Sequence, residues 1–246
     1  METLIKNDNM QPIKFAAMRC GDCPIRHRAV CARCDEDEFQ TLEKLKSYKT
    51  YAAGDMIYWR GEPLEYVASL VTGVAQLSKT LEDGRTQMVG LLLPSDFIGR
   101  PGREAVGFDV IATTEVTLCR FQRAPFEKLV DETPHIAQRL MELALDELDA
   151  ARDWMMLLGR KTAREKIATF VDMLVRRQNG ASPNGDQPFE LPMTRDQIAN
   201  YLGLTLETVS RQLNALKRDG VIAFTDRKHI EVVDLAALRL ATGDDV

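Results

Sequence analysis

The 246-residue sequence has no apolar run approaching the roughly 20 residues that a membrane-spanning helix needs. Its first ten residues, METLIKNDNM, also lack the apolar segment of a secretory signal peptide. The sequence therefore predicts a protein of the cytoplasm that has no membrane partner.

Residue patterns typical of catalysis are missing as well. The three histidines, His27, His135 and His229, lie far apart in the sequence, and there is no nucleotide or flavin fingerprint. No arrangement of serine, histidine and aspartate can be argued either. We predict that the protein is not an enzyme, and an electron-transfer enzyme, the alternative from another class, finds no support in the sequence.

An overall positive charge is absent too, because 37 acidic residues outnumber 32 basic ones and give a net charge of -5. This balance does not exclude DNA as a partner, since affinity for DNA depends on the local field. The last quarter of the chain concentrates basic residues, namely Arg195, Arg211, Lys217, Arg218, Arg227 and Lys228.

Residues 193–220, MTRDQIANYLGLTLETVSRQLNALKRDG, predict two helices joined by a tight turn. Thr194 and Thr205 are residue types that cap helix N-termini, and each precedes a run with helical apolar spacing. Gly203 allows a sharp corner, and Gly220 favours a left-handed end to the second helix. Two short apolar runs follow, at 221–224 and 229–233, and the polar turn between them predicts a β-hairpin wing.

On the second helix, polar residues share the face opposite the apolar residues that the core requires. Arginine can donate two hydrogen bonds to guanine, glutamate can accept one from cytosine, and serine can serve either role. Each such residue alone is more typical of a solvated helix face, but the set favours a helix that enters the major groove. The predicted DNA-contacting residues are Thr205, Glu207, Ser210, Arg211, Asn214 and Arg218.

Upstream, short alternating runs interrupted by glycine predict a set of strands. Many short strands at this spacing favour a small β-roll or barrel. Cys119 falls on the last of them, where a lone cysteine usually behaves as a small buried hydrophobe. The predicted strands are residues 56–59, 67–71, 74–78, 88–93, 110–113 and 116–121.

A long helix over residues 133–158 carries an apolar seam at alternating spacings of three and four. A helix of this length with one seam favours a homodimer, and packing of the seam on the roll is the alternative. A second helix over 162–177 and a loop over 179–185 follow. The predicted interface residues are Ile136, Leu140, Leu143, Glu147, Ala151 (or its neighbour Ala150) and Trp154.

Four of the five cysteines lie within fifteen residues, in the stretch RCGDCPIRHRAVCARC. They are Cys20, Cys23, Cys31 and Cys34. In a cytoplasmic protein, two C-x-x-C pairs at this density indicate a metal site rather than disulfides. Spacing alone does not separate a local zinc knuckle from an iron-sulfur centre, because both accept four thiolates.

The order of these parts resembles the CRP/FNR superfamily of transcription regulators. The resemblance rests on Gly54-Asp55, on D-F-I-G at 96–99, and on E-x-x-S-R at 207–211 within NYLGLTLETVSR. It implies an α+β fold with a cyclic-nucleotide-binding-like β-roll, a long dimerisation helix and a C-terminal winged helix-turn-helix. The implied domains are a cluster-binding arm (1–47), the roll (48–132), the dimerisation helix (133–160) and the DNA-binding domain (161–246).

Within the superfamily, the cysteines are similar to the ligand set of the FNR/FnrL-type oxygen sensors. That resemblance implies a [4Fe-4S] cluster on Cys20, Cys23, Cys31 and Cys119, with zinc as the alternative metal. The familiar pattern is C-x2-C-x5-C, whereas seven residues separate Cys23 from Cys31 here. Cys34 is therefore retained as the spare or substitute ligand.

The same resemblance implies an oxygen-responsive regulator of anaerobic or microaerobic genes, mainly an activator and sometimes a repressor. Its cluster would stabilise a dimer on palindromes of the TTGAT-N4-ATCAA type, and oxygen would inactivate it. RNA polymerase would be a partner, with residues 82–85 and 179–186 as candidate contact surfaces.

Cyclic nucleotide is not expected as a ligand of the roll. Phe108-Asp109 stand where nucleotide-binding relatives have an arginine and a serine, and a carboxylate repels a phosphate. Arg103 keeps open the alternative of a same-fold regulator with a small-molecule effector in the roll, or with structural zinc.

Overall fold

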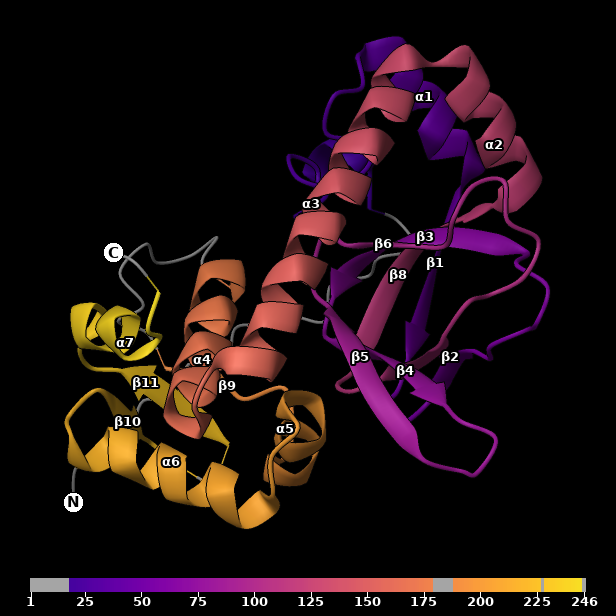
Figure 1. Cartoon of the computed structure of the whole chain (residues 1–246). Coiled ribbons are helices and arrows are strands. Elements are labelled where there is room, and N and C mark those ends of the chain that lie inside the picture. The colour runs from indigo at the N-terminus through magenta and orange to yellow at the C-terminus, as the bar shows by residue number, and fades with distance from the viewer. Residues whose placement is uncertain (1–17, 179–187, 227, 245–246) are drawn as a thin grey trace, which may run out of the picture.

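The computed structural model describes residues 18–178, 188–226 and 228–244 (Figure 1). The N-terminal part is helical, with the 3-10 turn η2 (Cys20–Asp22) and helix α1 (Glu36–Leu45). A capping box starts α1, because the Asp35 carboxylate accepts from the Glu38 N–H at 2.9 Å while Asp35 N–H donates to the Glu38 carboxylate at 2.8 Å. Neither element was predicted from the sequence.

Two four-stranded antiparallel sheets form the β-roll. Their strand orders are β1-β8-β3-β6 and β2-β7-β4-β5. The six predicted strands are all present, with ends shifted by one or two residues. Two further strands escaped prediction: β1 reads KSYKTY, too polar for a core strand, and β6 has only two residues. The bounds are β1 Lys46–Tyr51, β2 Met56–Tyr58, β3 Tyr66–Thr72, β4 Ala75–Thr80, β5 Thr86–Leu92, β6 Phe97–Ile98, β7 Asp109–Ala112 and β8 Val116–Gln122.

Helix α3 (Pro134–Arg160) is the long helix that the sequence predicts, and it runs from the end near α1 and α2 to the C-terminal domain (Figure 1). The unpredicted helix α2 (Arg123–Glu132) precedes it and buries Phe126 and Leu129. Helix α4 (Ala163–Gln178) follows α3 directly. No helix among the described residues is long and apolar enough to cross a membrane.

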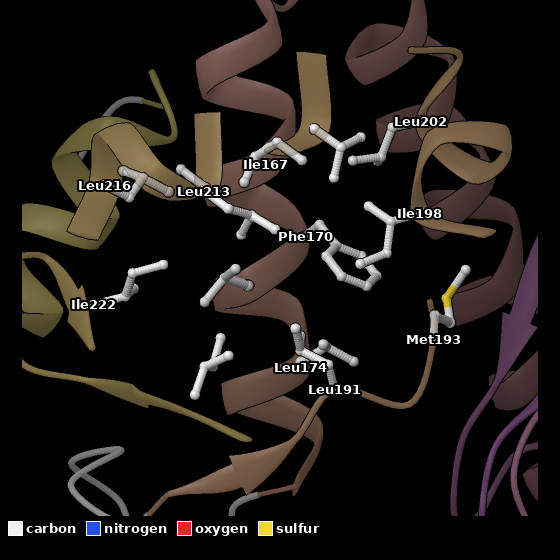
Figure 2. Packing of buried hydrophobic residues seen from close by; sticks show 14 of the residues in the cluster. Ile167, Phe170, Leu174, Leu191, Met193, Ile198, Leu202, Leu213, Leu216 and Ile222 are labelled. Carbon is white, nitrogen blue, oxygen red and sulfur yellow. The ribbon is translucent and has the colours of Figure 1, made fainter. Parts of the chain in front are cut away.

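The C-terminal domain is a winged helix-turn-helix with a core that α4 organises. Phe170 of α4 lies among Ile198, Leu213 and other buried side chains in Figure 2. The predicted pair of helices and the hairpin are confirmed, whereas β9 and α7 were not predicted. The elements are β9 Phe189–Glu190, α5 Arg195–Leu202, α6 Leu206–Arg218, β10 Ile222–Phe224, β11 His229–Val232 and α7 Leu235–Ala241, and the sheet order is β10-β11-β9.

Candidate functional site

Local capping and one glycine turn place α6 in the geometry of a recognition helix. The Thr194 hydroxyl accepts from the Gln197 N–H at 3.2 Å and starts α5. Gly203 ends α5 with φ of 61°, a left-handed conformation that glycine adopts without strain. Thr205 then starts α6 by accepting from the Thr208 N–H at 3.2 Å. The tight corner predicted from the sequence is therefore formed.

Helix α6 divides into a buried face and an exposed polar face. Its buried residues are Val209, Leu213 and Leu216. Within the described ranges, the side chains on the polar face make no hydrogen bond or ion pair with another described residue, so their donors and acceptors are available to a ligand. These exposed residues are Glu207, Arg211, Asn214 and Arg218.

Ser210, like the capping residue Thr205, already forms a side-chain hydrogen bond within the protein. It is half-buried, and its hydroxyl accepts from Arg195 Nη1 at 3.3 Å. The Arg195 guanidinium also lies 5.8 Å from the centre of the Phe224 ring, and Lys217 Nζ lies at the same distance. These cation-π contacts tie α5 and α6 to the wing. From the sequence, Arg195 was noted only as one of several basic residues; in the structure it supports the polar face of α6 by contacting Ser210 and Phe224.

The N-terminal cysteines and Cys119 come together although some 85 or more residues separate them in the chain. Cys119 lies on β8, paired with Tyr48 of β1 and Ser69 of β3, and is 9% exposed. Cys23, Cys31 and Cys34 pack against the hydrophobic cluster to which Cys119 belongs. Cys20 Sγ lies 3.6 Å from Lys46 Nζ. The cysteine segment, defined as residues 20–34, is therefore seated on the wall of the roll.

Burial, and then the neighbouring thiols, raise the pKa values of Cys31, Cys34 and Cys119. Burial is the main cause for Cys31, whose pKa rises to about 11 with further contributions from Cys23 and Cys20. Burial likewise raises the pKa of Cys34 to about 12, and Cys31 adds to the effect. The pKa of Cys119 is raised by burial and by the thiols of Cys20, Cys23 and Cys31. A metal that binds these sulfurs must therefore displace protons.

The five cysteines are donors that fit a thiolate-ligated metal centre. A tetrahedral zinc with Zn–S bonds of about 2.3 Å holds its sulfurs about 3.8 Å apart. Among the described residues, only Asp35, Glu38 and His135 bring three donor atoms within 4.8 Å of one another. No three described cysteine sulfurs lie within 4.8 Å of one another, and thiolates are ligands that both zinc and iron-sulfur clusters accept.

The seven residues between Cys23 and Cys31 have a structural role that the spacing alone did not reveal. Ile25, Ala29 and Val30 are at most 3% exposed and share a hydrophobic cluster with Ile136 of α3. From α3, Arg139 donates to the backbone oxygens of Arg28 at 2.5 Å and Ala29 at 3.4 Å. The residues between the two cysteines therefore fill the space between the roll and α3, and we name Ile25, Ala29 and Val30 the plug.

An ion-pair network extends this contact along α3. Glu142 binds Arg33 of the cysteine segment, with 2.6 Å between Arg33 Nη2 and Glu142 Oε1, and Arg139 Nη1 at 3.1 Å. Two turns before Glu142, His135 Nδ1 lies 3.0 Å from Glu38 Oε1 of α1. The first half of α3 is thus fixed to the segment that carries the cysteines.

The predicted interface residues of α3 require a correction. Ile136 is fully buried in the protomer, and Leu140 and Leu143 pack against the same cluster. Trp154 stacks on Tyr201 of α5 with 4.0 Å between ring centres. Ile136 therefore cannot contact a second copy, whereas Leu140, Leu143 and Trp154 are half-buried and pack against the protomer's own core. Glu147 and Ala151 are exposed, as is Ala150.

A second apolar row on α3 is exposed in the protomer. Met141, Leu145, Leu148 and Met155 recur at spacings of four, three and seven, and each is between 46% and 65% exposed. Ala144 and Ala151 lie beside them and are exposed too. We name these six residues the outer row. Sequence periodicity found the inner seam, and the structure shows that the outer row is the unpartnered one.

Two family models match most of the chain. The Crp-like helix-turn-helix domain matches residues 136–241, and the cyclic nucleotide-binding domain matches residues 48–133. The chain belongs to the CRP/FNR family of transcription regulators. Among relatives of this CRP/FNR regulator, the transcriptional activator protein FnrL of Cereibacter sphaeroides is 60% identical over 230 residues, which are 92% of this chain and 93% of that protein.

Two further comparisons agree with that assignment. The nitrogen fixation regulation protein FixK of Bradyrhizobium diazoefficiens is 40% identical over 83% of this CRP/FNR chain and 86% of its own. The solved structure of FixK2 from Bradyrhizobium japonicum superposes with a TM-score of 0.74 and 34% identity, covering 82% of this chain and 100% of that one. The expected β-roll, long helix and winged helix-turn-helix are thereby confirmed.

The roll of this CRP/FNR chain retains a cavity of about 1200 Å³ beside α3. Arg100, Arg103 and Phe108 are among its lining residues. Asp109 turns to the backbone, where its carboxylate accepts from the Arg60 N–H at 2.9 Å. The cavity is the place where the small-molecule effector of the alternative reading would bind.

Proposed function

We propose that the protein is an oxygen-responsive transcription regulator of the cytoplasm, mainly an activator of anaerobic or microaerobic genes. The observation that carries the proposal is the convergence of the cysteine segment on Cys119, which joins the N-terminal region to the roll beside α3. The relatives support it, since the similar FnrL protein is a transcriptional activator by name.

Cys20, Cys23, Cys31 and Cys119 would hold a [4Fe-4S] cluster, and zinc is the alternative metal. Cys31 is taken as the third N-terminal ligand, with Cys34 as the spare or substitute. A bound cluster supplies an oxygen-labile link between the cysteine segment and β8. Lys46, close to Cys20, offsets negative charge there.

The protein's own contacts explain how such a link would control DNA binding. In this proposal the cluster holds the cysteine segment on the roll and so maintains the packing of Ile25, Ala29 and Val30 against Ile136. Arg139 and Glu142 transmit that placement along α3. An ordered α3 presents the outer row to a second copy, and the homodimer sets two α6 helices about one DNA turn apart.

The palindrome TTGAT-N4-ATCAA is the proposed target, read by Glu207, Ser210 and Arg211, with Asn214 and Arg218 nearer the phosphates. Replacing Arg211 with alanine is expected to reduce discrimination by ~1 to 3 kcal/mol at the base that it contacts, because a bidentate arginine pair is lost. Titrations of consensus, single-substituted and scrambled duplexes by fluorescence anisotropy would measure it. Equal losses on all three duplexes would make Arg211 a phosphate contact.

Arg218→Ala is the matched control for that experiment. This arginine is exposed in the last turn of the same helix, so its replacement is expected to weaken all duplexes alike and to lower the salt dependence of binding. Loss of discrimination in Arg218→Ala would exchange the two roles.

RNA polymerase is the proposed protein partner. Residues 82–85 form the exposed turn between β4 and β5, in which the Asp83 carboxylate accepts from Arg85 Nε at 2.8 Å. They remain a candidate contact surface. The other candidate, 179–186, lies outside the described residues.

A Mössbauer spectrum of anaerobically prepared, iron-57-labelled protein tests the proposal. A [4Fe-4S] signal that is lost on brief exposure to air is expected, together with a loss of palindrome binding in the same sample. Zinc in place of iron, with DNA binding indifferent to air, would overturn the sensor and direct attention to the cavity of the roll.

A further inference from the structure

The β-roll contributes a side chain to the core of the DNA-binding domain. Met88 of β5 is 3% exposed and belongs to the hydrophobic cluster formed by α4, α5, α6 and the wing. Leu91, from the same strand, packs against that cluster. Strand β5 is the edge of its sheet, and it lies beside α5 in Figure 1. The two domains of one protomer therefore share packing.

Two hydrogen bonds fix the position of β5 relative to α5. The Met88 N–H donates to Asn200 Oδ1 at 3.1 Å, so a side chain of α5 takes the place of a neighbouring strand. Gln87 Nε2 donates to the Asn200 backbone oxygen at 3.1 Å. We name Gln87, Met88 and Asn200 the β5 brace. It combines a buried apolar anchor with two directional bonds, an arrangement that resists both sliding and rotation.

Two other contacts also hold the DNA-binding domain against the rest of the protomer. Arg177 Nη1 at the end of α4 lies 2.8 Å from Asp96 Oδ1 of the roll. Trp154 of α3 stacks on Tyr201, the residue after Asn200. By contrast, the covalent connection from α3 to α4 is short and extended, with Lys161 at φ -71° and ψ 142°. The orientation of α6 relative to α3 is therefore set by packing rather than by the linker.

We infer that the β5 brace determines which spacing between DNA half-sites the dimer accepts. This inference rests on the proposed dimeric DNA-binding function. One added base pair moves the second half-site by about 3.4 Å and turns it by about 35° around the DNA axis. A braced domain can follow only by withdrawing Met88 from the core. A domain without the brace can turn at Lys161 and follow at little cost.

The test is a set of palindromes with spacers of two to six base pairs, together with a duplex carrying a single half-site. Wild-type protein is expected to lose affinity steeply at every spacer except its preferred one. In Met88→Ala that loss should be smaller by about tenfold or more, because a methionine's burial no longer has to be undone. Affinity for the single half-site should be unchanged, which shows that the recognition domain is still folded.

Substitutions of Asn200 keep the test decisive if Met88→Ala folds poorly. Asn200→Ala removes the acceptor for the Met88 N–H and should also flatten the spacer profile. Asn200→Asp keeps that acceptor and should restore the wild-type profile. Thr80→Ala is the matched control, because Thr80 bonds to Thr86 in the same hairpin and makes no described contact with α5. Its profile should equal that of the wild type.

The outcomes separate this inference from the proposed function. A Met88→Ala or Asn200→Ala protein that binds DNA with an unchanged spacer preference would overturn the brace alone. So would a loss of equal size at every spacer, as expected for Arg211→Ala. A wild-type protein that binds no palindrome at all would overturn the proposed function, and the inference would fall with it.

Discussion

Replacing Cys119 with alanine is expected to abolish cluster binding and to lower palindrome affinity by about 100-fold or more. The affinity falls because two linked half-site contacts gain about 10² to 10⁴ over one, and Cys119→Ala removes the link that stabilises the dimer. Cys119 is the only cysteine of the proposed set that lies on the roll, so the remaining ligands cannot join the cysteine segment to β8. Iron and acid-labile sulfide per protomer, with duplex titrations under nitrogen, measure both effects.

Cys34→Ala is the matched control for Cys119→Ala. It removes a thiol from the same cluster of side chains but keeps Cys20, Cys23 and Cys31, so iron content and DNA affinity should stay near wild type. If instead Cys34→Ala loses iron while Cys31→Ala retains it, Cys34 is the third ligand. A Cys119→Ala protein with full metal content would mean that the four N-terminal cysteines form a local knuckle.

Leu148→Glu is expected to convert the dimer to a monomer and to reduce palindrome affinity to that of a single half-site. Leu148 lies in the middle of the outer row and is 46% exposed in the protomer. In a two-fold dimer the row meets itself, so each substitution places two like charges in an apolar contact. The protomer should keep its melting behaviour, because this side chain supports none of its described core. Sedimentation velocity and duplex titration give the two readouts.

Ala150→Glu places the same charge two residues away, at another exposed position on α3 but off the outer row. It should leave the dimer intact. A dimer that survives Leu148→Glu and dissociates with Ala150→Glu would return the interface to the inner side of the helix, against the burial of Ile136.

Short-range chemistry explains why the recognition helix could be predicted from the sequence. Thr194 and Thr205 cap helices through bonds to residues three positions away, and Gly203 takes its left-handed conformation locally. Such signals are complete within a few residues. The same holds for the alternating strands of the roll, but not for β1, whose place depends on pairing with β8, from Lys46 with Phe121 to Tyr51 with Val116.

The sequence could not show which of the two apolar rows of α3 is buried in the protomer and which is exposed. Helical periodicity identifies residues that share a face, but it does not say what that face meets. Ile136 and Trp154 are covered by the roll and by Tyr201, which leaves Met141 and Leu148 outside. Only the packing of distant segments decides which row is available to a second copy.

The sequence by itself determined the kinds of parts in this protein: a thiol-rich segment, a roll, a long helix and a capped helix pair with a polar reading face. The tertiary structure alone decided how they are connected. It brought Cys119 to the cysteine segment, set the plug against Ile136 and inserted Met88 of the roll into the DNA-binding domain. Each of these contacts joins residues that are far apart in the chain, and their burial depends on every surrounding element being in place.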